Sequence, residues 1–101
     1  MDIKSLTTLM NEFVCSKGWY QANSPKVQSA KNLAISLSLE ASEVLEHFQW
    51  SENYENKDDL ASELADVGLY LLQLASVNGI DLEKAIIEKL SINANREWDP
   101  E

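Results

Sequence analysis

Apolar residues recur along most of this chain at steps of three and four, which is the spacing of one helix face. Residues 1–17 form the first such segment. Lys17 followed by Gly18 is a helix-stop signal, because a cation suits the last turn and glycine suits the left-handed position beyond it. Residues 19–27 have no such periodicity and contain asparagine, serine and proline, so they predict a loop.

Three more helical segments follow this loop. The short polar connection at 51–57 predicts that the helices on either side of it are antiparallel neighbours. Gly79 ends the third helix, Asp81 is a good N-cap for the fourth, and Pro100 lies beyond the end of the fourth. The predicted segments are residues 28–50, 58–78 and 81–98. We therefore expect one all-α domain of 101 residues, built as a bundle of four helices.

Two acidic pairs stand beside the apolar stripes of the second and third segments. Glu40 and Glu43 form one pair, and Glu63 and Asp66 form the other. Residues three apart lie on one helix face, and a helical projection puts all four at the boundary of the core. Glu46 falls nearly opposite the stripe and should be solvated. If the two helices pack antiparallel, the two acidic flanks can face each other.

Four carboxylates at one place supply the oxygen ligands that hard divalent cations prefer. The cluster has no thiolate, and His47 is the only imidazole in the chain, so Mg²⁺ is favoured, with Mn²⁺ as the alternative, over Zn²⁺. The competing interpretation is that these are surface acids of an acidic protein, because charge runs are usually solvated faces. His47 is likewise either a surface residue or a candidate base.

The charge balance limits the partners. Seventeen acidic and eight basic residues give a net charge of -9, which disfavours nucleic acid and anionic membranes as partners. A phosphorylated small molecule stays compatible if a divalent cation bridges it to the protein. We find no apolar stretch near the roughly 20 residues of a membrane span, and no signal peptide. Cys15 cannot form an internal disulfide, so we expect a cytoplasmic protein with this residue in its core.

Two further groups of residues are candidates for binding. Lys89, Asn93 and Arg96 share one face of the fourth helix. They would either pair with neighbouring acids or meet the phosphates of a ligand. Trp19 and Tyr20 open the loop after the first helix, where they either cover the end of the bundle or stack on a planar ligand.

Three segments resemble the MazG-like all-α nucleoside triphosphate pyrophosphohydrolases, and within them the short single-domain branch that includes dCTP pyrophosphatases. They are LAISLSLEASEVLEHFQW, ELADVGLYLLQLA and DLEKAIIEKLSINANRE. The resemblance covers residues 31–96. Its motifs are E-x-x-E before F-Q-W, E-x-x-D with a tyrosine four residues on, and K-x-x-x-N in the last helix.

The resemblance implies roles for particular residues. The implied magnesium ligands, which act in catalysis, are Glu40, Glu43, Glu63 and Asp66. The implied substrate contacts are Trp19 and Trp50 near the nucleobase, and Tyr70, Lys89, Asn93 and Arg96 near the sugar and phosphates. Family members often carry a histidine-proline signature after the tryptophan. The segment QANSPKVQSAKN has no histidine, so base selectivity is the property that this departure leaves open.

The resemblance also implies an activity and an assembly. The activity is Mg²⁺-dependent hydrolysis of deoxynucleoside or ribonucleoside triphosphates to a monophosphate and pyrophosphate. Preferred substrates would be dCTP-like pyrimidine nucleotides, in house-cleaning of the dNTP pool. The assembly is a homodimer or homotetramer with sites completed across subunits. The alternatives are a non-catalytic module that senses a nucleotide or metal, and a plain helical interaction partner, antitoxin-like in kind.

Overall fold

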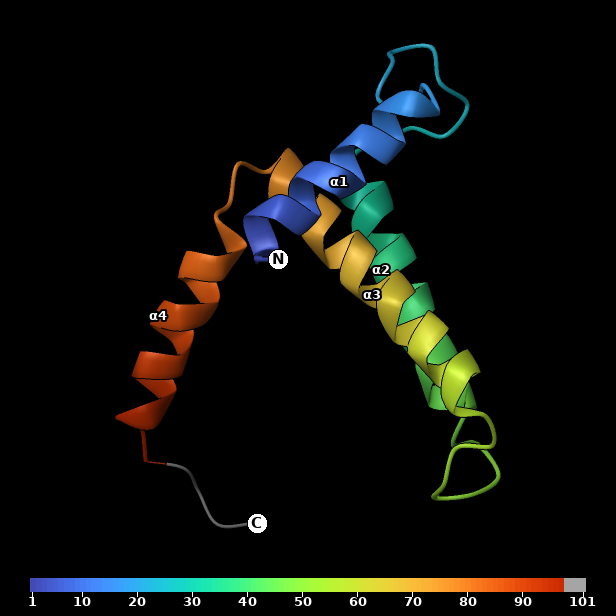
Figure 1. Ribbon diagram of the computed structural model, residues 1–101, viewed down its shortest axis with the longest axis vertical. Helices are drawn as coiled ribbons and strands as arrows, with labels where there is room; N and C mark the ends of the chain where they lie inside the picture. The colour runs from blue at the N-terminus through green and yellow to red at the C-terminus, as the bar shows by residue number, and fades with distance from the viewer. Residues whose placement is uncertain (98–101) are drawn as a thin grey trace.

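The computed structural model describes residues 1–97, which form four α-helices and no β-strand (Figure 1). The helices are α1 (Ile3–Ser16), α2 (Ala30–Glu46), α3 (Lys57–Val77) and α4 (Leu82–Ala94). The all-α prediction is therefore confirmed. The fourth helix ends at Ala94, four residues before the predicted end at residue 98, and the predicted stop at Pro100 lies outside the described part of the chain.

Local signals fix where most of these helices begin and end. Each helix starts at a polar side chain that accepts a hydrogen bond from a backbone N–H of the first turn. These caps are Asp2, Ser29, Asn56 and Asp81. Gly18 and Gly79 have φ of 71° and 65°, a left-handed conformation that glycine adopts without strain. The glycines therefore end α1 and α3 as the sequence predicts.

The second helix is shorter than its apolar pattern suggests. It ends at Glu46, four residues before the predicted end at residue 50. The backbone N–H groups of His47, Phe48 and Gln49 bond to carbonyls three residues back, so the chain tightens into a turn. Trp50 consequently lies outside the helix, with 88% of its surface exposed.

Helices α2 and α3 pack side by side as an antiparallel pair, and α1 crosses them at the end where α2 begins and α3 finishes (Figure 1). The most buried apolar side chains come from these three helices: Met10, Val14, Leu33 and Ala75. Cys15 is exposed rather than in the core as predicted, because Met10 and Val14 define the buried face of α1 and Cys15 is turned away from it.

The fourth helix does not close a bundle within one copy of the chain. It contacts α1 near its own start and then diverges from the α2–α3 pair (Figure 1). The radius of gyration is 16.2 Å, against about 13 Å for a compact chain of this length. The accessible surface is 7995 Å², against about 5,800 Å² for a compact monomer of this mass. The prediction of a four-helix bundle is therefore wrong for a single copy of the chain, in which α4 stands apart and apolar surface remains uncovered.

The expectation that no segment is apolar enough to span a membrane is wrong for α3. By length and composition alone it could cross a membrane, since its most apolar 18-residue window has a mean hydropathy of 1.3. The core helices of many soluble proteins meet the same criterion, so this is weak support for a membrane span. In this chain α3 packs against both α1 and α2.

Candidate active site

Two polar stripes run along α2 and α3. Their members follow steps of three and four, so each stripe lies on one helix face. On α2 they are Asn32, Ser36, Glu40 and Glu43, and on α3 they are Asp59, Glu63, Asp66, Tyr70 and Gln73. Because the helices are antiparallel, the end of the α2 stripe lies beside the start of the α3 stripe. The acids gather at that end, and the amides and hydroxyls gather at the other.

The acidic end is a compact cluster. Glu40, Glu43 and Glu63 each offer one carboxylate oxygen, and these three oxygens lie within 4.8 Å of one another. Asp66 is outside this group, but its charge raises the pKa of both Glu40 and Glu63. The structure therefore brings the four predicted carboxylates into one electrostatic unit.

The mutual repulsion of these acids shows in their protonation. Burial, a hydrogen bond with Glu43 and the neighbouring negative charges raise the pKa of Glu40 to about 7. A hydrogen bond with Glu43, burial and the charges of Glu43 and Asp66 raise the pKa of Glu63, and the charge of His47 acts in the opposite direction. In the metal-free chain, part of the cluster is thus protonated at neutral pH.

The donor chemistry of the cluster fits a hard divalent cation. Glu40 Oε2 and Glu63 Oε2 are buried and accept no hydrogen bond from residues 1–97. A buried carboxylate oxygen without a donor is costly, and a cation held between the carboxylates removes that cost. The cluster offers oxygen ligands, which Mg²⁺ and Mn²⁺ prefer.

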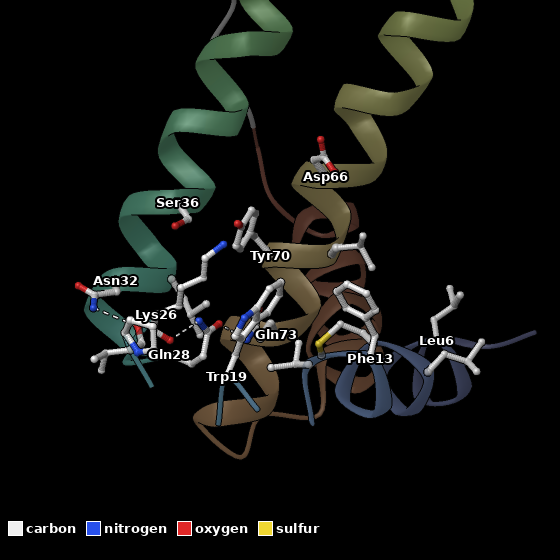
Figure 2. A pocket seen from close by; sticks show the side chains of 17 residues that line it. Leu6, Phe13, Trp19, Lys26, Gln28, Asn32, Ser36, Asp66, Tyr70 and Gln73 are labelled. Atoms are coloured by element: carbon white, nitrogen blue, oxygen red, sulfur yellow. Dashed lines mark hydrogen bonds between the residues drawn. The ribbon is translucent and has the colours of Figure 1, made fainter. Parts of the chain in front are cut away.

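A cavity of about 780 Å³ extends from Asp66 along the groove between α2 and α3 to α1 and the following loop (Figure 2). The predicted residues Trp19 and Tyr70 both line it. The Trp19 ring packs edge-on against Phe13, with 5.6 Å between ring centroids. The Lys26 ammonium lies 4.8 Å from the Trp19 centroid, a cation–π contact. The cavity thus connects an aromatic surface to the acidic cluster.

A second, polar cavity of about 340 Å³ lies at the other side of the cluster. Glu43 and Glu63 contribute to its lining, together with His47 and Trp50. His47 is the C-cap residue of α2, which places it beside the acids. Trp19 and Trp50, both expected near a nucleobase, therefore line different cavities in a single copy of the chain.

Lys89 and Asn93 on α4, and Arg96 two residues beyond its end, are not brought to the cluster within one copy of the chain. Neither cavity is lined by Lys89, Asn93 or Arg96. Lys89 and Arg96 are exposed, and Asn93 is half-buried. Any contact between these residues and a ligand of the carboxylates requires α4 of another copy or a movement of this helix.

The cavity also contains polar residues that the sequence did not single out. They are Lys26, Gln28, Asn32, Ser36 and Gln73. For three of them a signal exists: Asn32 and Ser36 continue the Glu40 face toward the start of α2, and Gln73 continues the Asp66 and Tyr70 face. Gln73 is only 4% exposed. Following the two acidic stripes to their far ends would have found these residues.

Comparisons with known proteins place the chain among nucleotide-processing relatives. It is 31% identical to dCTP pyrophosphatase 1 of Rattus norvegicus and of Homo sapiens, over 93% of this chain and 58% of each relative. It thus spans less than two thirds of the length of these curated proteins. The crystal structure of a pyrophosphatase from Archaeoglobus fulgidus DSM 4304 matches with a TM-score of 0.74 and 33% identity. That match covers 92% of this chain and 89% of the other.

The family assignment rests on the segment that carries the acidic stripes and α4. The model of the MazG-like family matches residues 35–100, about two thirds of the chain. The match includes all four carboxylates of the cluster, and the archaeal structure agrees in overall fold. The chain therefore belongs to the MazG-like family.

Proposed function

We propose that this chain is a Mg²⁺-dependent nucleoside triphosphate pyrophosphohydrolase. It converts a nucleoside triphosphate, with dCTP-like pyrimidine nucleotides preferred, to the monophosphate and pyrophosphate, and so clears unwanted dNTPs from the pool. The observation that carries this proposal is the carboxylate cluster at the end of a cavity lined by Trp19 and Tyr70. The names of the dCTP pyrophosphatase relatives and of the archaeal pyrophosphatase support it.

In this proposal Glu40, Glu43, Glu63 and Asp66 hold the cation. A bound Mg²⁺ would neutralise part of the triphosphate charge and would lower the pKa of a coordinated water. Glu40 gives up its proton when the site is loaded, because a metal ligand must be deprotonated. The negative charge of the cluster repels a nucleotide in the absence of the cation, so binding of metal and substrate is coupled.

The cavity then receives the nucleoside. An aromatic face favours a nucleobase by stacking, an interaction worth about 1–3 kcal/mol per base. Trp19 offers such a face, and the Lys26 ammonium lies over the same ring. Tyr70 lies on α3 between Trp19 and Asp66, at the position of the sugar (Figure 2). The phosphates point toward Asp66 and the carboxylates beyond it.

We further propose that the working unit is a homodimer or homotetramer. The uncovered surface of the single copy supports this, because α4 presents Ile87 and Leu90 to solvent with 61% and 64% of their surfaces exposed. In the assembly, Lys89, Asn93 and Arg96 of one copy stabilise the phosphates held by the carboxylates of another. Trp50 would likewise act across the interface, near the nucleobase.

The test is incubation of the purified chain with each canonical dNTP and NTP, with and without Mg²⁺, and identification of both products. We expect monophosphate and pyrophosphate in the presence of Mg²⁺, with dCTP among the best substrates. Absence of pyrophosphate from every nucleotide would refute the proposal. Release of orthophosphate instead of pyrophosphate would show that the bond between the α- and β-phosphates is not the one that is cleaved.

A further inference from the structure

Gln73 takes part in a partly buried network of hydrogen bonds at the floor of the large cavity. Its Nε2 donates to Gln28 Oε1 at 2.6 Å, and Gln28 Nε2 donates to the backbone carbonyl of Lys26 at 2.7 Å. On the other side, the Tyr20 hydroxyl donates to Asn11 Oδ1 at 2.6 Å. Tyr20 thus ties the loop to α1, and Gln28 ties the same loop to α3.

The backbone carbonyl of Lys26 fixes the polarity of this network. A carbonyl can only accept, so the amide nitrogen of Gln28 must face it and the amide oxygen of Gln28 must face Gln73. That arrangement in turn requires the nitrogen of Gln73 to face Gln28. Neither amide can turn over without placing two acceptors or two donors against each other.

The hydrogen bond to Gln28 uses a donor of Gln73 and leaves the acceptor oxygen of Gln73 without a donor. One N–H is donated to Gln28. An amide has two N–H donors and one acceptor oxygen. Among residues 1–97, no side-chain hydrogen bond is donated to Gln73 Oε1, and this oxygen is not one of the fully buried atoms without a partner. Although the residue is only 4% exposed, the oxygen therefore remains accessible in the cavity that Gln73 lines.

The position of this oxygen suits the far end of a nucleotide. Gln73 lies seven residues beyond Asp66 on the same face of α3, a separation of about 10 Å along the helix. Figure 2 shows Gln73 and Gln28 beside Trp19, at the end of the cavity away from Asp66. A ligand with its phosphates at the carboxylates would thus bring its base to Gln73, at a distance comparable with the length of a nucleoside monophosphate.

We propose that Gln73 is a specificity-determining residue, whose carbonyl oxygen accepts a hydrogen from the exocyclic amino group of a cytosine base stacked at Trp19. This rests on the proposed function of the same site. A uracil or thymine in that position presents a carbonyl oxygen instead, so two acceptors would face each other in a buried site. The network holds Gln73 in the orientation that recognises an amino group, and Gln28 acts as a positioning residue.

The first test changes the substrate and keeps the wild-type chain. We would compare kcat/KM for dCTP, for dUTP and for the 2-pyrimidinone analogue of dCTP, which lacks the 4-amino group. We expect dCTP to be preferred over each of the others by at least about tenfold, because sites that pair a polar group of the base reject analogues without it. Equal kcat/KM values for the three nucleotides would overturn the proposal.

The second test changes the residue. Gln73→Met keeps a similar length without the amide, and we expect the dCTP to dUTP ratio to fall to near one. Gln21→Met makes the same chemical change at an exposed loop residue outside the cavity lining, and should leave the ratio as in the wild type. If Gln73→Met does not fold, Gln28→Met replaces it, since it removes the group that orients Gln73. A folded variant with an unchanged ratio contradicts the proposal.

A binding measurement separates this inference from the proposed activity. Thermal shifts would be recorded with dCMP and with dUMP in the presence of Mg²⁺, because a monophosphate has no phosphoanhydride bond that the proposed activity could hydrolyse. We expect dCMP to raise the Tm more than dUMP, and Gln73→Met to abolish the difference. Absence of turnover with any nucleotide refutes the proposed activity alone. Equal shifts with dCMP and dUMP refute the role of Gln73 alone.

Discussion

Glu40 on α2 and Glu63 on α3 bring carboxylate oxygens within 4.8 Å of each other, and the Oε2 atom of each is buried and accepts no hydrogen bond from residues 1–97. Two such groups in contact are unfavourable in the absence of a positive charge, because each disfavours ionisation of the other. The pair nevertheless forms between α2 and α3, the two helices that pack most extensively against each other. This arrangement is understandable as a site prepared for a cation.

Replacement of Glu43 by glutamine should separate the metal site from ordinary surface charge. Glu43→Gln removes one of the three clustered carboxylates. We expect Mg²⁺-dependent hydrolysis to fall by more than about tenfold. Mutation of residues that only hydrogen-bond to metal ligands already lowers metal affinity or activity by at least that factor. Glu46→Gln makes the same change at an exposed residue one turn away and should reduce the rate far less. Full activity of Glu43→Gln at saturating Mg²⁺ would refute the ligand assignment.

The pH dependence of stability tests the same cluster without an activity assay. Glu40 has a pKa of about 7 in the folded chain and an ordinary value of 4.5 when unfolded. Between these values the folded state binds more protons than the unfolded state, so the free energy of unfolding in EDTA should decrease as the pH rises from 4.5 to about 7. The raised pKa of Glu63 acts in the same direction.

Mg²⁺ should reverse this trend, since it binds the deprotonated carboxylates. We expect a larger Mg²⁺-induced increase in Tm at pH 8 than at pH 5, measured by circular dichroism. Glu40→Gln should flatten the pH profile in EDTA and reduce the Mg²⁺ effect, whereas Glu46→Gln should retain both. A Mg²⁺ effect of the same size at pH 5 and pH 8 would argue against the cluster as the binding site.

Local sequence signals were enough to predict the helices and the acidic cluster. Caps such as Asp81 and stops such as Gly79 act through hydrogen bonds and φ angles within a few residues. The pairing of acids at steps of three likewise follows from helix geometry. The end of α2 was predicted four residues late, because an apolar residue such as Phe48 continues the stripe whether or not the backbone has already tightened.

The long-range arrangement was not accessible in the same way. Gln28 and Gln73 are 45 residues apart, and their contact exists only because the loop folds back onto α3. The position of α4 is similar, since periodicity shows that a helix has an apolar face but not which surface covers it. The exposed Ile87 and Leu90 would look the same in sequence if they were packed on α2.

The apolar face of α4 should control assembly. Leu90→Glu places a charge in the proposed interface, and we expect a smaller species by sedimentation velocity at micromolar concentration, with loss of nucleotide hydrolysis. The helix itself should persist by circular dichroism, because this residue is 64% exposed in a single copy. Lys84→Glu is a stringent control, since it changes the charge by two units at an exposed polar position near the start of the same helix and also removes the ion pair with Glu88. An unchanged sedimentation coefficient for Leu90→Glu would exclude this face from the interface.

A mixing experiment decides whether one active site draws on two copies of the chain. Glu43→Gln disables the carboxylate cluster, and Lys89→Ala removes a cation of α4, so each homo-oligomer should be inactive or nearly so. If Lys89 serves the cluster of its partner, a mixed dimer contains one site with both changes and one intact site. Random assortment of equal amounts then restores about one quarter of the wild-type sites. Recovery should require co-refolding or subunit exchange. As a control, the two variants are mixed and assayed before their subunits can exchange, and this mixture should show no recovery. If both residues instead act within the same copy, no mixed dimer has an intact site, and the activity of the mixture stays at the average of the two variants.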